Sequence, residues 1–366
     1  MKKIAIFFLK LALILLIFAW LFYRASRDNA WERISQCHPN GWLILTAFLL
    51  ALSGTLITFV RWGWLVRALG VPISLRQTLR LGAIGYVFNL SPMGIVGGDL
   101  VKGILLANQS PGAKAACAVS VIVDRVIGLY AMFITGIFGI AMTGFWRETA
   151  PVAVFSTRLV LGLFALSSAG LIFLLIPESR RKGRRRLLRA IPLAGPLFEK
   201  LYAASNAYSR HWGVLTGSLL ATFAVHGLFT LSLWAYARGL YGYAPTCLEH
   251  LVIYPTANCG TIIPLSAGPL EYYLDLLYPL FPVAGQETAG AGYGSMIGII
   301  SRIGMIINAA IGGVFCLMSR SEIGAALEQI REDEARQKSK PGLKPESKIT
   351  PENGNQEESA GGGGIA

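Results

Sequence analysis

Long apolar runs separated by short polar stretches predict an all-α protein that crosses a membrane several times. A helix needs about 20 apolar residues to span the hydrocarbon core of a bilayer. We interpret the N-terminal run as a retained helix because it is too long for a signal peptide and no small-residue cleavage site follows it. Uninterrupted runs predict spans at about 4–23, 42–60, 115–143, 152–176, 213–236 and 292–318.

Two further apolar stretches, 79–106 and 248–281, are broken by Gly and Pro, which brings the expected number of membrane segments to about eight. The first contains NLSPMGIVGGDLVKG and the second contains IIPLSAGPLEYYLDLLY. Each has a proline, a short Gly-rich stretch and then a carboxylate, which is Asp99 in the first and Glu271 in the second. Because proline ends a helix, these stretches predict two broken, re-entrant hairpins.

An arginine follows each broken stretch in the next apolar run, Arg125 after the first and Arg302 after the second. The order of features therefore repeats. We expect two repeats of opposite orientation, at about 42–145 and 213–318, within one bundle of residues 1–320. Paired Gly/Pro-broken segments in inverted halves are typical of the binding sites of transporters.

Basic residues set the expected orientation, because loops on the cytoplasmic side carry an excess of Lys and Arg. The loop at 178–200 contains RRKGRRRLLR and is predicted to be cytoplasmic. It lies on the same side as the N-terminus only if 79–106 enters and leaves on one side. The tail, 321–366, is polar and predicted to be a disordered cytoplasmic segment after a short helix that follows Ser321. Nucleic-acid binding by the basic loop is the weaker interpretation.

Irregular backbone at membrane depth survives only where it is buried in protein or lines a wet cavity. Gly97 and Gly98 permit close backbone approach and a positive φ. A half-helix that starts near Gly98 would direct free N–H groups into such a cavity and favour an anionic group there. The candidate substrate-binding residues are Asn89, Pro92, Gly97, Gly98, Asp99, Lys102, Asp124, Arg125, Pro264, Ser266, Gly268, Glu271 and Arg302.

Charges inside the membrane are costly unless they are paired. Asp124 and Arg125 are sequence neighbours on different sides of a helix, so they cannot neutralise each other. We therefore expect Asp99 or Glu271 to pair with Arg125 or Arg302. Two interpretations stay open: structural ion pairs that hold the hairpins, or a site that binds an anion.

Three further patterns carry weaker expectations. Trp62 and Trp64 predict an interfacial belt, with Arg61 and Arg67 at the headgroups. His226 lies in an apolar run, where it is either functional or a hydrogen-bonded core residue. Small residues spaced four apart predict tight helix packing, at Gly213 with Gly217 and at Gly294 with Gly298.

Composition agrees with the membrane class, since 54% of the residues are hydrophobic and 14% are charged. The net charge of +13 is concentrated in part in the basic loop. The five cysteines and four histidines are scattered. We therefore expect no zinc-type framework or other metal site and no cofactor.

Four motifs occur in order: RWxxLxxALG, FNLxPxGxxGGD, VDRxxG and PxSAGPxE. Together they resemble the flippase-like transmembrane domain of bacterial lysylphosphatidylglycerol synthases, over about residues 5–320. The resemblance implies a bundle of about eight spans in the bacterial inner membrane that moves or holds lipids. Lys102 and Pro269 depart from the family pattern, in which Arg and Gly are expected. Lys102 keeps the charge but not the bidentate fork that binds phosphate.

The soluble domain that transfers the aminoacyl group would follow the bundle, and only the tail follows it here. We therefore expect a lipid transporter and not an enzyme. The alternatives are an accessory subunit of an envelope-lipid enzyme and an intramembrane transferase that acts on a lipid-linked sugar. Membrane lipids are the expected partners, with nucleic acid excluded; a second copy of the chain or an envelope enzyme remains an open alternative.

Overall fold

The computed structural model describes most of the chain between residues 30 and 328 and a few residues before that. The described residues are 16–17, 19–20, 22–23, 26–27, 30–90, 95–175, 207–208, 210–260, 267–283 and 292–328. Residues Met1–Ala326 form one compact unit, and a second unit, Leu327–Ala366, lies almost entirely outside the described part. The described residues are in helices, turns and short connections, without strands.

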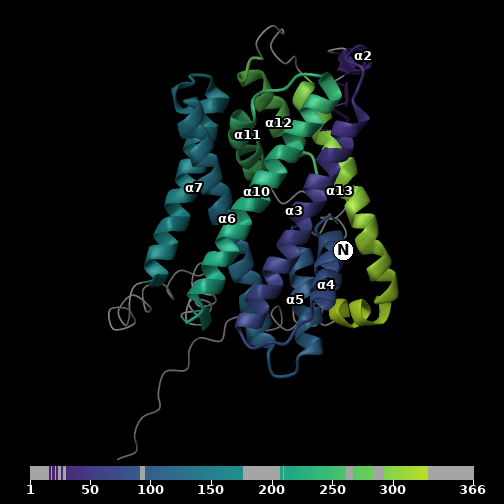
Figure 1. The fold of residues 1–366 in the computed structure, drawn as a ribbon, viewed down its shortest axis with the longest axis vertical. Helices are drawn as coiled ribbons and strands as arrows, with labels where there is room; N and C mark the ends of the chain where they lie inside the picture. The colour runs from purple at the N-terminus through teal and green to yellow at the C-terminus, as the bar shows by residue number, and fades with distance from the viewer. Residues whose placement is uncertain are drawn as a thin grey trace, which may run out of the picture. The chain divides into compact units, whose positions relative to one another are not determined.

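Five long helices form the framework of the first unit (Figure 1). They are α3 (Gly41–Ala68), α6 (Lys114–Thr143), α7 (Pro151–Leu175), α10 (Trp212–Tyr241) and α13 (Tyr293–Met318). All five are long and apolar enough to cross a membrane. They coincide with five of the predicted spans, and the all-α polytopic fold is confirmed. The predicted span at 4–23 lies mostly outside the described residues.

Four shorter helices occupy the two broken stretches. They are α4 (Leu75–Asn89), α5 (Ile95–Gln109), α11 (Cys247–Cys259) and α12 (Pro269–Leu277). A helix of 15 residues, the length of α4 and of α5, reaches about 22 Å, which is less than the hydrocarbon core of about 30 Å. The predicted breaks therefore fall between α4 and α5 and between α11 and α12. Pro92, Pro264 and Ser266 lie in these breaks, outside the described residues.

The two pairs of short helices lie at opposite ends of the long helices. Helices α4 and α5 pack against each other, as do α11 and α12. Figure 1 shows α4 and α5 in the lower half of the bundle, and α11 and α12 in the upper half. The chain enters α4 from the lower end of α3 and enters α11 from the upper end of α10. The second pair is therefore inserted in the direction opposite to the first.

Capping residues in the sequence define where the short helices α11 and α12 begin. Thr246 caps α11 in a reciprocal capping box, in which its hydroxyl accepts from the N–H of Glu249 and the Glu249 carboxylate accepts from the N–H of Thr246. Pro269 is the first residue of α12, where a missing N–H costs nothing. Gly268 precedes it with a φ of 104°, a conformation that side chains rarely adopt. The glycine at this position is thus required by the backbone.

Glycines permit the closest helix contacts. A Cβ on Gly98 of α5 would overlap the carbonyl oxygen of Gly85 on α4. A Cβ on Gly294 of α13 would overlap the carbonyl oxygen of Leu274 on α12. Tight packing at Gly294 and Gly298 is confirmed, whereas the same prediction for Gly213 and Gly217 is wrong, since a Cβ on either meets open space. Spacing alone does not show which face of a helix has a neighbour.

The predicted helix after Ser321 is present, because residues 320–328 are helical. It contacts the base of the first pair of short helices, where Arg80 donates to Ser319 Oγ at 2.7 Å and to Glu322 Oε1 at 2.6 Å. Gln109 of α5 also donates to Glu322, at 2.9 Å. The basic loop at 178–200 and the rest of the tail lie outside the described residues.

We expect Gly294→Ala to lower the stability of the folded protein by about 1–3 kcal/mol, the usual cost of overpacking a close contact. The backbone of α12 would have to move, because the added methyl overlaps a carbonyl oxygen and not a flexible side chain. Thermal unfolding in detergent measures the effect. Gly217→Ala is the matched control, since its methyl meets open space; equal melting temperatures for the two variants would contradict the packing described.

Candidate functional site

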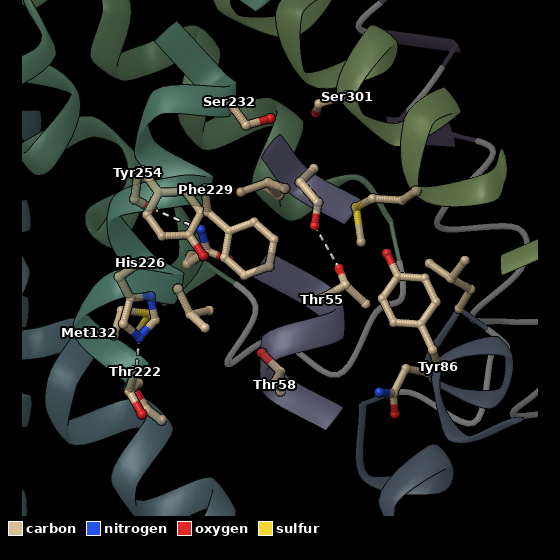
Figure 2. Close-up of a pocket in the computed structure, with 18 of the residues that line it drawn as sticks. Thr55, Thr58, Tyr86, Met132, Thr222, His226, Phe229, Ser232, Tyr254 and Ser301 are labelled. Atoms are coloured by element: carbon tan, nitrogen blue, oxygen red, sulfur yellow. Dashed lines mark hydrogen bonds between the residues drawn. The ribbon is translucent and has the colours of Figure 1, made fainter. Parts of the chain in front are cut away.

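A cavity of about 410 Å³ lies between the two pairs of short helices and is lined by α3, α4, α5, α6, α10, α11, α12 and α13. Figure 2 shows part of its wall, with Phe229 and Tyr254 close together and with Thr55, Thr58 and Tyr86 bordering the same space. The size falls in the range of sites for small ligands or headgroups. The cavity is the place where the two halves of the chain meet.

Five charged side chains form a network on one wall, which we call the charge cluster: Arg61, Asp99, Lys102, Asp124 and Arg125. Arg61 donates to Asp124 Oδ1 through Nε at 3.0 Å and through Nη2 at 2.8 Å. Lys102 Nζ lies 3.0 Å from Asp99 Oδ1 and 3.5 Å from Asp124 Oδ2. Arg125 Nε donates to Asp99 Oδ2. Each carboxylate of the cluster thus contacts two cations.

The cluster is assembled from three helices. Asp99 and Lys102 are one turn apart on α5, so both point to the same side. Asp124 and Arg125 are neighbours on α6 and do not pair with each other among the ion pairs of the described residues: Asp124 contacts Arg61 of α3 and Lys102 of α5, and Arg125 contacts Asp99 of α5. Arg61 comes from α3 and also donates to Thr222 Oγ1 on α10 at 2.6 Å. The cluster therefore ties together helices that are distant in sequence.

The interfacial prediction is wrong for Arg61 and Trp62. Both are buried, with exposed fractions of 4% and 0%. Trp62 donates to Ser120 Oγ at 3.3 Å, and Lys102 Nζ lies 4.8 Å from the centre of its ring, a cation–π contact.

Trp64 and Arg67 are exposed, as expected for the interface. Arg61 and Trp62 lie on the face of α3 that continues the polar positions of Thr55 and Thr58. That periodicity is the signal that could have placed Arg61 inside.

A second ion pair lies in the other half of the chain. Arg302 Nε on α13 donates to Glu271 Oε1 on α12 at 2.6 Å. Glu271 is fully buried, and its Oε2 accepts from the N–H of Gly268 at 2.8 Å. The expected pairing of the carboxylates with the arginines is confirmed within each half.

The two pairs correspond in their order along the chain. In each half the carboxylate lies on the second short helix and the arginine lies on the long helix that follows it, as Asp99 with Arg125 and Glu271 with Arg302. Two related halves would show this correspondence. The exact bounds of the repeats stay a prediction.

The other candidate residues are distributed as follows. Asn89 ends α4 and lines the cavity. Gly97 and Gly98 lie inside α5, which starts at Ile95, and neither is among the glycines with a positive φ in the described residues. Helix α5 begins three residues before the expected start near Gly98. Gly98 makes the close backbone approach that the sequence suggested, against the carbonyl oxygen of Gly85. Gly268 does have the positive φ that sequence reasoning placed in the first hairpin.

Several residues of the wall were not in the predicted site. Thr222 and His226 come from α10, with His226 Nε2 3.0 Å from the carbonyl oxygen of Gly128. Since a carbonyl only accepts, that nitrogen carries the proton. Tyr86 and Tyr254 add aromatic rings to the lining. The sequence had singled out His226 because it lies in an apolar run, and the structure shows that it is both hydrogen-bonded and part of the cavity wall.

The lining carries more positive than negative charge. Among the described residues, the cavity is lined by Arg61, Lys102, Arg125 and Arg302 and by two carboxylates, Asp99 and Asp124. With Glu271, the partner of Arg302, four cations face three carboxylates, which leaves one positive charge. An excess cation in a low-dielectric setting attracts an anion strongly. The arrangement is suited to bind a group with negative charge.

The family model described as lysylphosphatidylglycerol synthase TM region matches residues 7–300. No curated protein and no solved structure matches the chain.

We expect Arg302→Gln alone to destabilise the protein by about 3–5 kcal/mol, because Glu271 would keep a buried charge without its partner. Glu271→Gln should have a similar effect for the converse reason. The double replacement Glu271→Gln/Arg302→Gln should be less destabilised than either single variant. A double-mutant cycle from unfolding in detergent measures this coupling; additive losses would contradict a direct buried pair.

Proposed function

We propose, because the chain belongs to the lysylphosphatidylglycerol synthase TM region family, that it is a lipid transporter of the membrane. The proposed activity is movement of an anionic or phosphate-bearing lipid between the two leaflets. The observation that carries the proposal is the cavity inside the bundle, whose lining keeps one positive charge beyond its own carboxylates. A headgroup can be held there away from hydrocarbon.

The short helices support the same proposal. We propose that α4 with α5 and α11 with α12 are re-entrant hairpins that approach the cavity from opposite sides of the membrane. Short helices that end at membrane depth leave backbone groups without helical partners, and these groups are tolerated beside a wet cavity. Opposed hairpins around a central site are the arrangement by which many transporters expose a site to one side at a time.

The proposed setting is the bacterial inner membrane, with both termini in the cytoplasm. The lower end of the bundle in Figure 1 carries Arg67, Arg76, Arg80 and Lys114, and it is the end that the charge rule assigns to the cytoplasm. The proposed movement makes or breaks no covalent bond, so the chain would act without catalysis. Two alternative functions are an accessory subunit of an envelope enzyme and an intramembrane transferase. The test below distinguishes both from a transporter.

We expect the purified chain in vesicles to move a labelled anionic lipid between leaflets, and Asp99→Asn and Arg125→Ala each to reduce the rate by more than about tenfold. The reason is that both residues line the cavity and form one ion pair. Arg147→Ala is the control, because Arg147 is exposed, follows the C-terminal end of α6 and lies over the ring of the neighbouring Trp146. The assay is dithionite quenching of fluorescent lipids with anionic and zwitterionic headgroups.

Two outcomes would contradict the transport proposal. A well-folded wild type that moves no lipid would favour an accessory subunit, and capture of an envelope enzyme would then be the next measurement. Turnover of a lipid-linked sugar by the wild type would favour a transferase. Both readouts use the full chain.

The orientation has its own test. Cys247 is exposed at the start of α11, and Asn108 is exposed near the end of α5, at the opposite end of the bundle. In a variant whose other four cysteines are replaced by serine, we expect Cys247 to react with an impermeant maleimide added outside spheroplasts. Cysteine at position 108, introduced as Asn108→Cys, should react only after permeabilisation. The reverse pattern would invert the proposed topology.

A further inference from the structure

We propose that Arg125 is the residue that binds the substrate, and that the substrate headgroup is a phosphodiester with one net negative charge. In the structure Asp99 pairs with Arg125, at the position that we propose for that phosphate. When the phosphate arrives, Asp99 gives up Arg125 and stays paired with Lys102. This inference rests on the proposed function. It adds the class of headgroup and names Asp99 as the residue that displaces the headgroup from Arg125.

Exposure separates Arg125 from the other cations of the cavity. Its side chain is 42% exposed, whereas the side chains of Arg61 and Lys102 are 4% and 9% exposed. Arg302 is 12% exposed. All four line the cavity, so the accessible guanidinium is that of Arg125. Arginine presents a planar fork that matches the oxygens of a phosphate.

Charge balance gives the net charge of the ligand. Without Arg125, the charge cluster contains two cations, Arg61 and Lys102, and two carboxylates, Asp99 and Asp124. Among the described residues these four charges balance one another, and Arg125 adds the fifth charge of the cluster. A ligand with one negative charge on Arg125 would neutralise the cluster. A phosphomonoester, with close to two negative charges, would leave an excess negative charge, and a zwitterion would bring a further cation.

The exchange is possible because Asp99 has a second cation within reach. Lys102 Nζ already lies 3.0 Å from Asp99 Oδ1, one turn further along α5. The ring of Trp62 and the carboxylate of Asp124 hold this ammonium from two other directions. Asp99 therefore keeps a partner when the phosphate takes Arg125. This avoids the several kcal/mol that an unpaired buried carboxylate costs.

The corresponding pair in the second half lacks these properties. Glu271 is fully buried, and its second oxygen is fixed by the N–H of Gly268 at 2.8 Å. Gly298 packs against its side chain, so that even an added Cβ there would lie 2.9 Å from Glu271 Cγ. No second cation contacts Glu271 in the described part of the chain. Glu271 and Arg302 hold the second hairpin in place, while Asp99 and Arg125 exchange partners.

Asp99 competes with the phosphate for Arg125, and this competition also helps the site to release its ligand. A site must bind its ligand well enough to load and weakly enough to unload. Asp99 returns to Arg125 as the phosphate leaves, so release exposes no unpaired guanidinium. Loss of the Asp99 charge should then strengthen binding and slow transport together. A purely structural aspartate would weaken both.

The experiment measures binding to the full chain in maltoside detergent by calorimetry. The probes are dihexanoyl phosphatidylglycerol, with one net negative charge, and dihexanoyl phosphatidic acid and dihexanoyl phosphatidylcholine, which differ in net charge. Glycerophosphoglycerol and inorganic phosphate are added to separate a lipid headgroup from a free phosphate. We expect phosphatidylglycerol to bind most tightly, and glycerophosphoglycerol to bind more weakly because it has no acyl chains.

Four variants complete the test. Asp99→Asn should bind dihexanoyl phosphatidylglycerol about tenfold more tightly than wild type while lipid movement in vesicles falls. Arg125→Gln should lose binding, and Arg125→Lys, which keeps the charge, should bind weakly. Glu271→Gln is the matched variant in the second half and should not tighten binding. If it does not fold, Glu271→Gln/Arg302→Gln takes its place.

The inference is overturned if Asp99→Asn binds phosphatidylglycerol no more tightly than wild type, or if phosphatidic acid or phosphatidylcholine binds as well as phosphatidylglycerol. Tightest binding by inorganic phosphate would also overturn it, in favour of a free-anion site. Failure of the proposed function has a different signature. In that case wild type shows the expected binding and the tighter Asp99→Asn complex, and it moves no lipid in vesicles.

Discussion

A charge inside a membrane protein must be neutralised by another charge or by hydrogen bonds, because the surrounding hydrocarbon offers neither. The rest of this structure depends on that constraint. Arg61, on α3, is held by Asp124 of α6 and by Thr222 of α10. Lys102 of α5 joins the same network. The charges that make the cavity polar are therefore also the contacts that position the helices around it.

The same constraint explains why short helices and glycines occur together. A helix that stops at membrane depth requires a neighbouring helix to approach closely and exclude lipid from its end. Gly85 with Gly98 permits this approach in the first half. In the second half, Gly294 and Gly298 of α13 permit it against α12. Close packing thus compensates for the loss of continuous spans, and the polar ends of the short helices border the cavity.

The two ion pairs, Asp99 with Arg125 and Glu271 with Arg302, differ in their surroundings. Glu271 is locked by a backbone N–H and by close packing, whereas Asp99 shares two cations and faces an exposed arginine. Under the proposed function, this asymmetry would let the first hairpin respond to the ligand while the second maintains the frame.

The sequence by itself predicted five long spans that the structure describes and the two breaks, because length and apolar runs act locally. It also predicted that Asp99 and Glu271 pair with Arg125 and Arg302, because unpaired charge is costly, but only the structure shows which carboxylate pairs with which arginine and that Lys102 also contacts Asp99. The sequence did not determine the role of Arg61, since a positive charge near the end of an apolar run suits an interface as well as a buried pair. Nor did it show that Gly98 packs inside a helix while Gly217 faces open space. Only the tertiary structure decided these points, because a helix face is buried or exposed depending on whether another helix packs against it.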